Sequence, residues 1–159
     1  KGQAMLNNDI LRSIRYMLDL SDGRIVEVIR EADPEFAIDK DHVQSFLRKE
    51  MEPGYAECSD AVLAHFLDGL VIHNRGRDES QPQRPVEKRI TNNLVLKKLR
   101  VAFELKDVDM HQLFEEAGFP VSKPELSALF RQPGHKHFRQ CGDQMLRNFL
   151  KGLTLRLRG

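Results

Sequence analysis

Two cysteines occupy positions where a thiol can become a nucleophile. Cys58 and Cys141 each precede a predicted helix, and the positive end of a helix lowers the pKa of a nearby thiol. A general base would also be needed, and the two halves of the chain do not share one. Lys136 and His137 precede Cys141, whereas a Pro-Gly pair holds the matching positions before Cys58. We therefore interpret both cysteines as small buried apolar groups with free thiols.

Metal binding and catalysis receive no support from the other reactive residues. His135, His137 and Cys141 lie within seven residues, but their spacing matches no recognised zinc site. The sequence contains no Ser-centred elbow, phosphate loop, dinucleotide fingerprint or His-Glu-x-x-His pair. We therefore expect no metal, no cofactor and no enzymatic activity.

Basic residues of the second half suggest a different chemistry, the binding of phosphates. Residues 81–159 hold 15 Lys or Arg and 8 Asp or Glu, whereas residues 1–80 hold 10 and 16. Clustered cations displace the counterions of nucleic acid and give salt-dependent binding. The candidates for nucleic-acid or anion binding are Lys97, Lys98, Arg100, Arg131, Lys136, Arg139, Arg147 and Lys151.

A helix-turn-helix would be one way to present these cations. A helix ending at Gly118, the turn 119–121 and a helix over 122–132 resemble that motif. The turn is about two residues too long for the tight form, and Glu125 would face phosphate badly. A second class of function therefore stays open, a protein-interaction adaptor or a self-associating scaffold held by the opposite charges of the two halves.

The elements that position these residues are repeated. Asn7-Asn8-x-x-Leu-Arg-x-x-Arg returns as Asn92-Asn93-x-x-Leu-Lys-x-x-Arg, at an offset of 85 residues. Cys-x-Asp-x-x-Leu-x-x-Phe-Leu-x-Gly-Leu begins at Cys58 and again at Cys141, at an offset of 83. The second copy is therefore two residues shorter, and the difference is expected in the loop near residues 33–35.

Each copy is predicted to form four helices, which makes the chain all-α. Apolar residues recur at helical spacing from Asn8 to Leu18, and over 22–32, 39–50 and from Asp60 onward, with Asn8 and Asp60 as expected N-caps. We expect a first repeat at 5–74, a linker at 75–89 and a second repeat at 90–157. A module of roughly 70 residues has a marginal core, so we expect the repeats to pack with pseudo-two-fold symmetry.

Some residues kept in both copies are not core residues. Gly69 and Gly152 fall inside helices, where close helix packing is the simplest reason for Gly. Asp60 and Asp143 are predicted N-caps. Two arginines also recur at equivalent positions, Arg15 as Arg100 and Arg48 as Arg131. They could form ion pairs within each copy, such as Arg15 with Asp60 and Arg100 with Asp143, or they could form one anion site per copy.

The repeated motifs identify a resemblance to a family. Asn-Asn-x-x-Leu-Arg/Lys-x-x-Arg, followed by Phe-Arg-x-Cys-Gly-Asp-x-x-Leu-Arg-x-Phe-Leu-x-Gly-Leu, resembles the YehS-like proteins from Met5 onward. These are small bacterial proteins built from a tandem domain of unknown function. The resemblance implies a bacterial, cytoplasmic, duplicated helical protein and supplies no activity, ligand or site residue.

Composition agrees with a soluble protein. The chain is 40% hydrophobic and 31% charged, and no apolar run reaches the roughly 18 residues of a membrane span. Residues 1–4 carry no secretory signal, and we expect Met5 to be the native start. The sequence therefore predicts a cytoplasmic binding or regulatory protein of unknown function, contacting nucleic acid through its second repeat, with the protein adaptor as the alternative.

Overall fold

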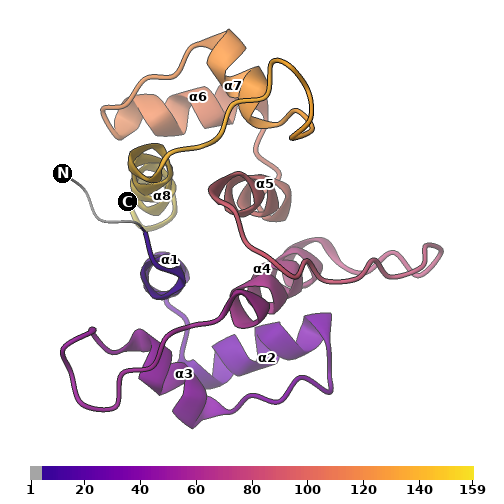
Figure 1. The fold of residues 1–159 in the computed structure, drawn as a ribbon, viewed down its shortest axis with the longest axis vertical. Coiled ribbons are helices and arrows are strands. Elements are labelled where there is room, and N and C mark those ends of the chain that lie inside the picture. The colour runs from indigo at the N-terminus through magenta and orange to yellow at the C-terminus, as the bar shows by residue number, and fades with distance from the viewer. Residues whose placement is uncertain (1–4) are drawn as a thin grey trace. The chain divides into compact units, whose positions relative to one another are not determined.

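Eight helices make up the part of the chain that the computed structural model describes, residues 5–159, which contains no strand. The expectations about residues 1–4 lie outside this range. The helices are α1 (Asn7–Leu18), α2 (Asp22–Ala32), α3 (Lys40–Leu47), α4 (Asp60–Arg75), α5 (Asn92–Ala102), α6 (Asp107–Glu116), α7 (Lys123–Leu129) and α8 (Asp143–Arg158) (Figure 1). The prediction of an all-α chain with two repeats of four helices is confirmed.

The chain divides into two compact units, one spanning Leu6–Ile90 and the other containing Thr91–Gly159. In the first unit α2 packs along α4, and α1 and α3 complete the core. A methyl group on Gly69 would overlap the carbonyl oxygen of Val28, so glycine is what lets α4 approach the backbone of α2. The close-packing interpretation of this glycine is therefore correct.

The second unit repeats the same packing. Its α6 lies against α8, and α5 also contacts α8. A methyl group on Gly152 would overlap the carbonyl oxygen of Leu113, the residue that corresponds to Val28. The fully buried Phe114 and Phe149 contact each other across this interface, with ring centroids 5.8 Å apart and ring planes tilted by 47°.

The helix caps differ from the prediction by one or two residues. Ser59 caps α4 by accepting the N–H of Val62, and Gly142 holds the N-cap position of α8, so Asp60 and Asp143 are the first helical residues. The expected cap Asn8 is likewise inside α1, whose N-cap position is Leu6. The prediction of these three caps was wrong because each side chain serves a contact elsewhere in the unit.

The length difference between the repeats lies where it was expected, between α2 and α3. Seven residues, 33–39, connect these helices, and six residues, 117–122, connect α6 and α7, with Ala117 matching the last residue of α2. The capping box of Ser122 and Glu125 is present. However, α7 has only seven residues instead of the predicted 122–132, and its connection exceeds the three or four residues of a tight helix-turn-helix.

Residues 76–91 carry neither helix nor strand, yet they are anchored to the first unit. Arg77 donates to the carbonyl of Glu31, and Gln83 donates to the carbonyl of Ala32 at 2.9 Å. At the other end, the N–H of Ile90 donates to Asp60 at 3.0 Å. This segment therefore runs along the first unit as part of it. Among the described residues, no helix combines the length and hydrophobicity that crossing a membrane requires.

Candidate nucleic-acid interface

Three elements of the second unit carry the eight basic candidates: α5, the loop 130–142 and α8. Asn93, near the start of α5, joins the first two elements. Its amide donates to the carbonyls of Leu129 and Arg139, both at 2.9 Å. The N–H of Arg139 donates to Ala128 at 3.1 Å, so the loop closes back on α7. These hydrogen bonds hold the start of α5 against the loop that carries Arg131, Lys136 and Arg139.

The side chain of Arg100 forms its contacts within its own unit. Its Nε donates to the carbonyl of Leu105 at 3.0 Å, and its Nη2 pairs with Asp107 at 2.5 Å. The guanidinium also lies 4.7 Å from the centroid of the Phe130 ring. The predicted pair with Asp143 was wrong, because Asp143 accepts from Asn92 at 2.8 Å. Arg100 is therefore a packing residue.

Arg139 is also neutralised within the unit. Its guanidinium pairs with Glu125, which in addition accepts the N–H of Ser122 at 3.0 Å. These contacts, the backbone hydrogen bond of Ser122 first, lower the pKa of Glu125 to about 2. The carboxylate that was expected to repel phosphate is thus already compensated by Arg139.

Of the acidic side chains of α6, Asp107 pairs with Arg100 and Asp109 is compensated in the same way. Asp109 pairs with Arg156 at 3.0 Å, and Arg156 also donates to Gln112 at 2.9 Å. The pKa of Asp109 is lowered, first by the backbone hydrogen bond from Lys106 and then by Arg156. Internal pairing therefore removes acidic groups from competition for the remaining cations.

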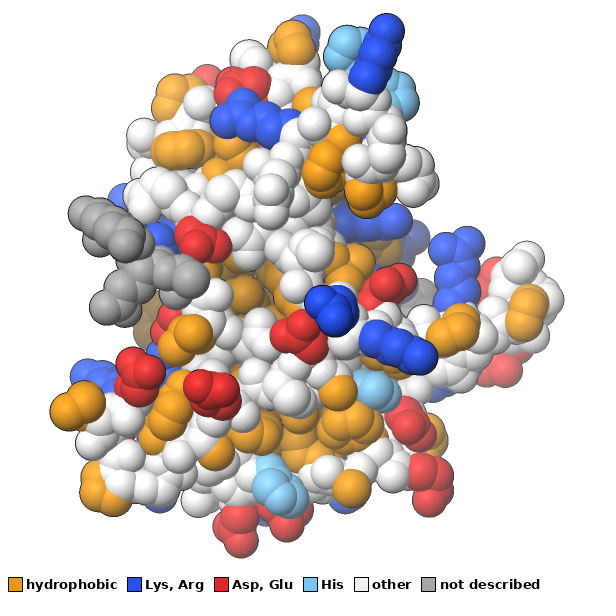
Figure 2. Space-filling model, viewed as in Figure 1, with side chains coloured by type: hydrophobic (Ala, Val, Ile, Leu, Met, Phe, Trp, Pro, Cys, Tyr) orange, Lys and Arg blue, Asp and Glu red, His pale blue; other side chains and the backbone are white. Residues whose placement is uncertain are grey.

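Four of the eight candidates are exposed, and their side chains form no hydrogen bond or ion pair with the described residues. They are Lys97, Arg131, Lys136 and Lys151. Lys98 and Arg147 are half-buried. Lys and Arg side chains are dispersed over the face shown in Figure 2 and do not form one continuous patch there.

The first repeat treats the equivalent positions differently. Arg15 and Arg48 line one pocket of about 310 Å³, with the acidic side chains of Asp22 and Glu52 beside them. The predicted pair of Arg15 with Asp60 was wrong. Asp60 accepts from Asn7 at 2.7 Å and from the N–H of Ile90, and these hydrogen bonds lower its pKa. The two arginines share a pocket, but equal numbers of acids balance their charge.

Both cysteines are buried, at 5% and 2% exposure. Burial raises the pKa of Cys58 to about 12 and that of Cys141 to about 11. Both thiols are therefore neutral at physiological pH, as their interpretation as buried apolar groups requires. His135 and His137 are exposed, with ring centroids 5.5 Å apart. Within residues 5–159, no cluster of three or more His, Cys, Asp or Glu side chains is arranged to hold a metal.

The tertiary role of the asparagine pairs was missed by sequence reasoning. Asn8 donates to the carbonyls of Phe46 and Ala56 and accepts the N–H of Cys58, while Asn7 donates to the carbonyl of Cys58 at 3.1 Å. Asn92 and Asn93 repeat these contacts around Cys141. The recurrence of both asparagines in both copies was the available signal, since a single cap needs only one.

Each repeat matches the same family model, described as "Protein of unknown function (DUF1456)", over residues 7–76 and 92–159. The chain belongs to the DUF1456 family. A relative from Escherichia coli (strain K12), described as an uncharacterized protein YehS, is 48% identical over 152 residues and covers 96% of each chain. The resemblance to YehS-like proteins is therefore confirmed. No solved structure matches this DUF1456 chain.

Proposed function

We propose that the chain is a non-enzymatic binding protein whose second repeat contacts the phosphates of nucleic acid. One observation carries the proposal: the side chains of Lys97, Arg131, Lys136 and Lys151 are exposed and have no hydrogen-bond or ion-pair partner among residues 5–159. Three acids of the second repeat, Asp107, Asp109 and Glu125, are paired with other cations. Uncompensated cations are what a polyanion exchanges for its counterions.

The proposed contact is with the phosphate backbone and carries little sequence specificity. Base reading through a helix-turn-helix needs a recognition helix that enters the major groove with its N-terminal residues. In α7 that first turn carries Glu125, whose carboxylate is bound to Arg139 and Ser122. A helix of seven residues is only about 10 Å long, which leaves little surface for bases.

The ionisation of the side chains supports a binding role over a catalytic one. A general acid at neutral pH needs a carboxyl group whose pKa is raised, and an activated thiol needs a lowered pKa. The pKa shifts of this chain have the opposite directions. The pKa values of the carboxyl groups of Asp60, Asp109 and Glu125 are lowered, and those of the thiols of Cys58 and Cys141 are raised. The two free thiols also support a reducing, cytoplasmic location.

Matched charge-reversal pairs test the proposal. Lys136→Glu with Lys151→Glu changes the second repeat, and Lys49→Glu with Arg84→Glu makes the same change in net charge outside it. Binding of a fluorescent single-stranded oligonucleotide at about 50 mM salt should weaken at least tenfold for the first pair, because each contributes phosphate contacts. Equal losses for both pairs would show a non-local charge effect and would reject the site.

A second candidate function rests on the charge division between the repeats. The first half has a net charge of −6 and the second half of +7, which suits self-association or an adaptor role. Leu155 and Leu157 of α8 are also exposed, at 47% and 41%. Sedimentation velocity at low and high salt distinguishes this role: salt-sensitive oligomers support it, and a monomer at both salt concentrations counts against it.

A further inference from the structure

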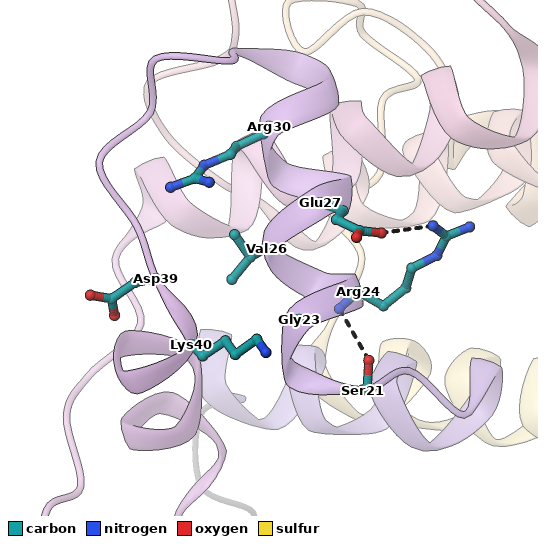
Figure 3. A pocket seen from close by; sticks show the side chains of 8 residues that line it. All are labelled: Ser21, Gly23, Arg24, Val26, Glu27, Arg30, Asp39 and Lys40. Atoms are coloured by element: carbon teal, nitrogen blue, oxygen red, sulfur yellow. Dashed lines mark hydrogen bonds and ion pairs between the residues drawn. The ribbon is translucent and has the colours of Figure 1, made fainter.

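A groove in the first repeat gathers cations within the acidic half of the chain. It lies between α2 and α3, has a volume of about 460 Å³ and is lined by Ser21, Gly23, Arg24, Val26, Glu27, Arg30, Asp39 and Lys40 (Figure 3). This volume falls within the range of small-molecule sites, about 300–1,000 Å³.

Two of its cations have donors to spare. Arg30 uses Nη2 to bind the carbonyl of Ile38 at 2.7 Å, and its other nitrogens make no contact with the described residues. Lys40 has no hydrogen bond or ion pair within residues 5–159. In Figure 3 the two side chains flank Val26, with the Lys40 amine directed toward Gly23. Both cations thus line the groove, one on each side of Val26.

The acidic side chains that line the groove are engaged elsewhere. Glu27 pairs with Arg24 at 2.8 Å. Asp39 caps α3 by accepting the N–H of His42 at 3.0 Å, and in Figure 3 its carboxylate points away from Lys40. That backbone hydrogen bond also lowers the pKa of Asp39. Neither carboxylate forms an ion pair with Arg30 or Lys40, although the charge of Arg30 also contributes to the lowered pKa of Asp39.

The residues of the groove are only partly repeated in the second copy. A Cβ atom at residue 23 would lie 3.0 Å from Cε of Lys40, so Gly23 gives this lysine its place beside the first turn of α2. The second repeat has Val108 at the position of Gly23 and Glu115 at the position of Arg30, whereas Lys123 corresponds to Lys40. The second repeat therefore keeps the lysine but lacks both the arginine and the glycine, so the two cations occur together only in the first repeat.

We infer that this groove binds a small phosphate-bearing ligand, with its phosphate between Arg30 and Lys40. Arginine and lysine are the residues that proteins use for phosphate, and the first turn of α2 adds the positive end of its dipole. Val26 provides an apolar contact for the remainder of the ligand. The site is separate from the proposed nucleic-acid contacts of the second repeat, so either assignment can fail without the other.

Backbone-amide NMR of the full chain, titrated with inorganic phosphate and with ribose 5-phosphate, tests the inference. Saturable shifts are expected at residues 21–24 and 39–42, with at least a tenfold loss of affinity in Arg30→Gln and in Lys40→Gln. Lys49→Gln, which makes the same charge change outside the groove, should bind as the unmodified chain does. Tighter binding of ribose 5-phosphate assigns the groove to a phosphorylated metabolite, and equal binding assigns it to free phosphate.

Gly23→Val separates the groove from net charge, because it installs the residue of the second repeat and alters no charge. It should weaken phosphate binding at least fivefold, since Lys40 must move, while the amide spectrum keeps its dispersion. Shifts that do not saturate, that spread over residues 81–159, or that all three groove variants leave unchanged would overturn the inference.

Discussion

Asn8 and Asn93 lie 85 positions apart and make the same three hydrogen bonds. Each amide nitrogen donates to two carbonyls, those of Phe46 and Ala56 or of Leu129 and Arg139, at 2.9–3.0 Å. Each amide oxygen accepts the N–H of a cysteine, Cys58 at 3.0 Å or Cys141 at 2.8 Å. In each unit one side chain thus fixes the loop that leads into the last helix.

Removal of this side chain should destabilise the fold. In Asn8→Ala the buried N–H of Cys58 and the carbonyl of Phe46 lose their partner, which should lower the free energy of unfolding by about 2–4 kcal/mol. Asn93→Ala should act in the same direction. Urea unfolding measures the change. Asn148→Ala is the control, because Asn148 bonds only within its own helix; an equal loss in the control would refute the role of Asn8.

The helix contacts at Gly69 and Gly152 should not tolerate a methyl group. Both Gly69→Ala and Gly152→Ala place a carbon against a backbone carbonyl, so the paired helices must separate. A cost of about 1–3 kcal/mol is expected, although alanine favours a helix by about 1 kcal/mol. Thermal unfolding measures the cost. Gly134→Ala is the control, because a methyl group at residue 134 would meet no other atom within 4 Å. Stabilisation by either helical substitution would contradict the packing.

The buried thiols should make stability fall in alkaline solution. Their pKa values are raised in the folded chain, to about 12 for Cys58 and about 11 for Cys141, above the ordinary value of 9.0. The unfolded chain therefore ionises first, and the stabilisation, complete below pH 9, declines as pH rises toward the folded pKa values. Melting temperatures between pH 8 and 10.5 measure this decline. In Cys58→Ala with Cys141→Ala the decline should be shallower; identical curves would contradict the account.

The two repeats are expected to depend on each other. Each has a small core, and we predict that they pack with pseudo-two-fold symmetry. Residues 5–90 and 91–159 expressed separately should each unfold at a lower temperature than the whole chain. Calorimetry of the two pieces and of their equimolar mixture measures the dependence. Two pieces as stable as the whole chain would show that the repeats fold independently.

The positions of the helices were predictable because the helical spacing of apolar residues and the internal sequence repeat indicate the same segments. The prediction for α2, residues 22–32, matches the structure, and the end of α3 was placed three residues too far, at 50 instead of Leu47. Sequence alone could not distinguish caps from tertiary contacts. Asp60 stands one residue after the true cap, Ser59, and its carboxylate holds Asn7 and Ile90. A capping residue and a residue that makes such tertiary contacts can both be an acidic residue at the start of a helix.

The sequence identified which basic residues could bind an anion, but it could not show which of them are already paired with an acid in the fold. Arg100 and Arg139 look identical to Arg131 in the sequence, yet Asp107 and Glu125 compensate them in the fold. The partner of Arg139 lies 14 residues away and is brought close by the turn after α7. The groove of Arg30 and Lys40 could not be predicted either, because its cations lie on two different helices of a repeat whose net charge is negative.

The salt dependence of oligonucleotide binding tests the central claim most directly. If Lys97, Arg131, Lys136 and Lys151 all contact phosphates, the slope of log affinity against log salt should be about −3 for single strands between about 50 and 200 mM salt. In Lys136→Gln with Lys151→Gln it should become shallower by about 1.4. No detectable binding at 50 mM salt, or a slope that this pair leaves unchanged, would contradict the proposed function.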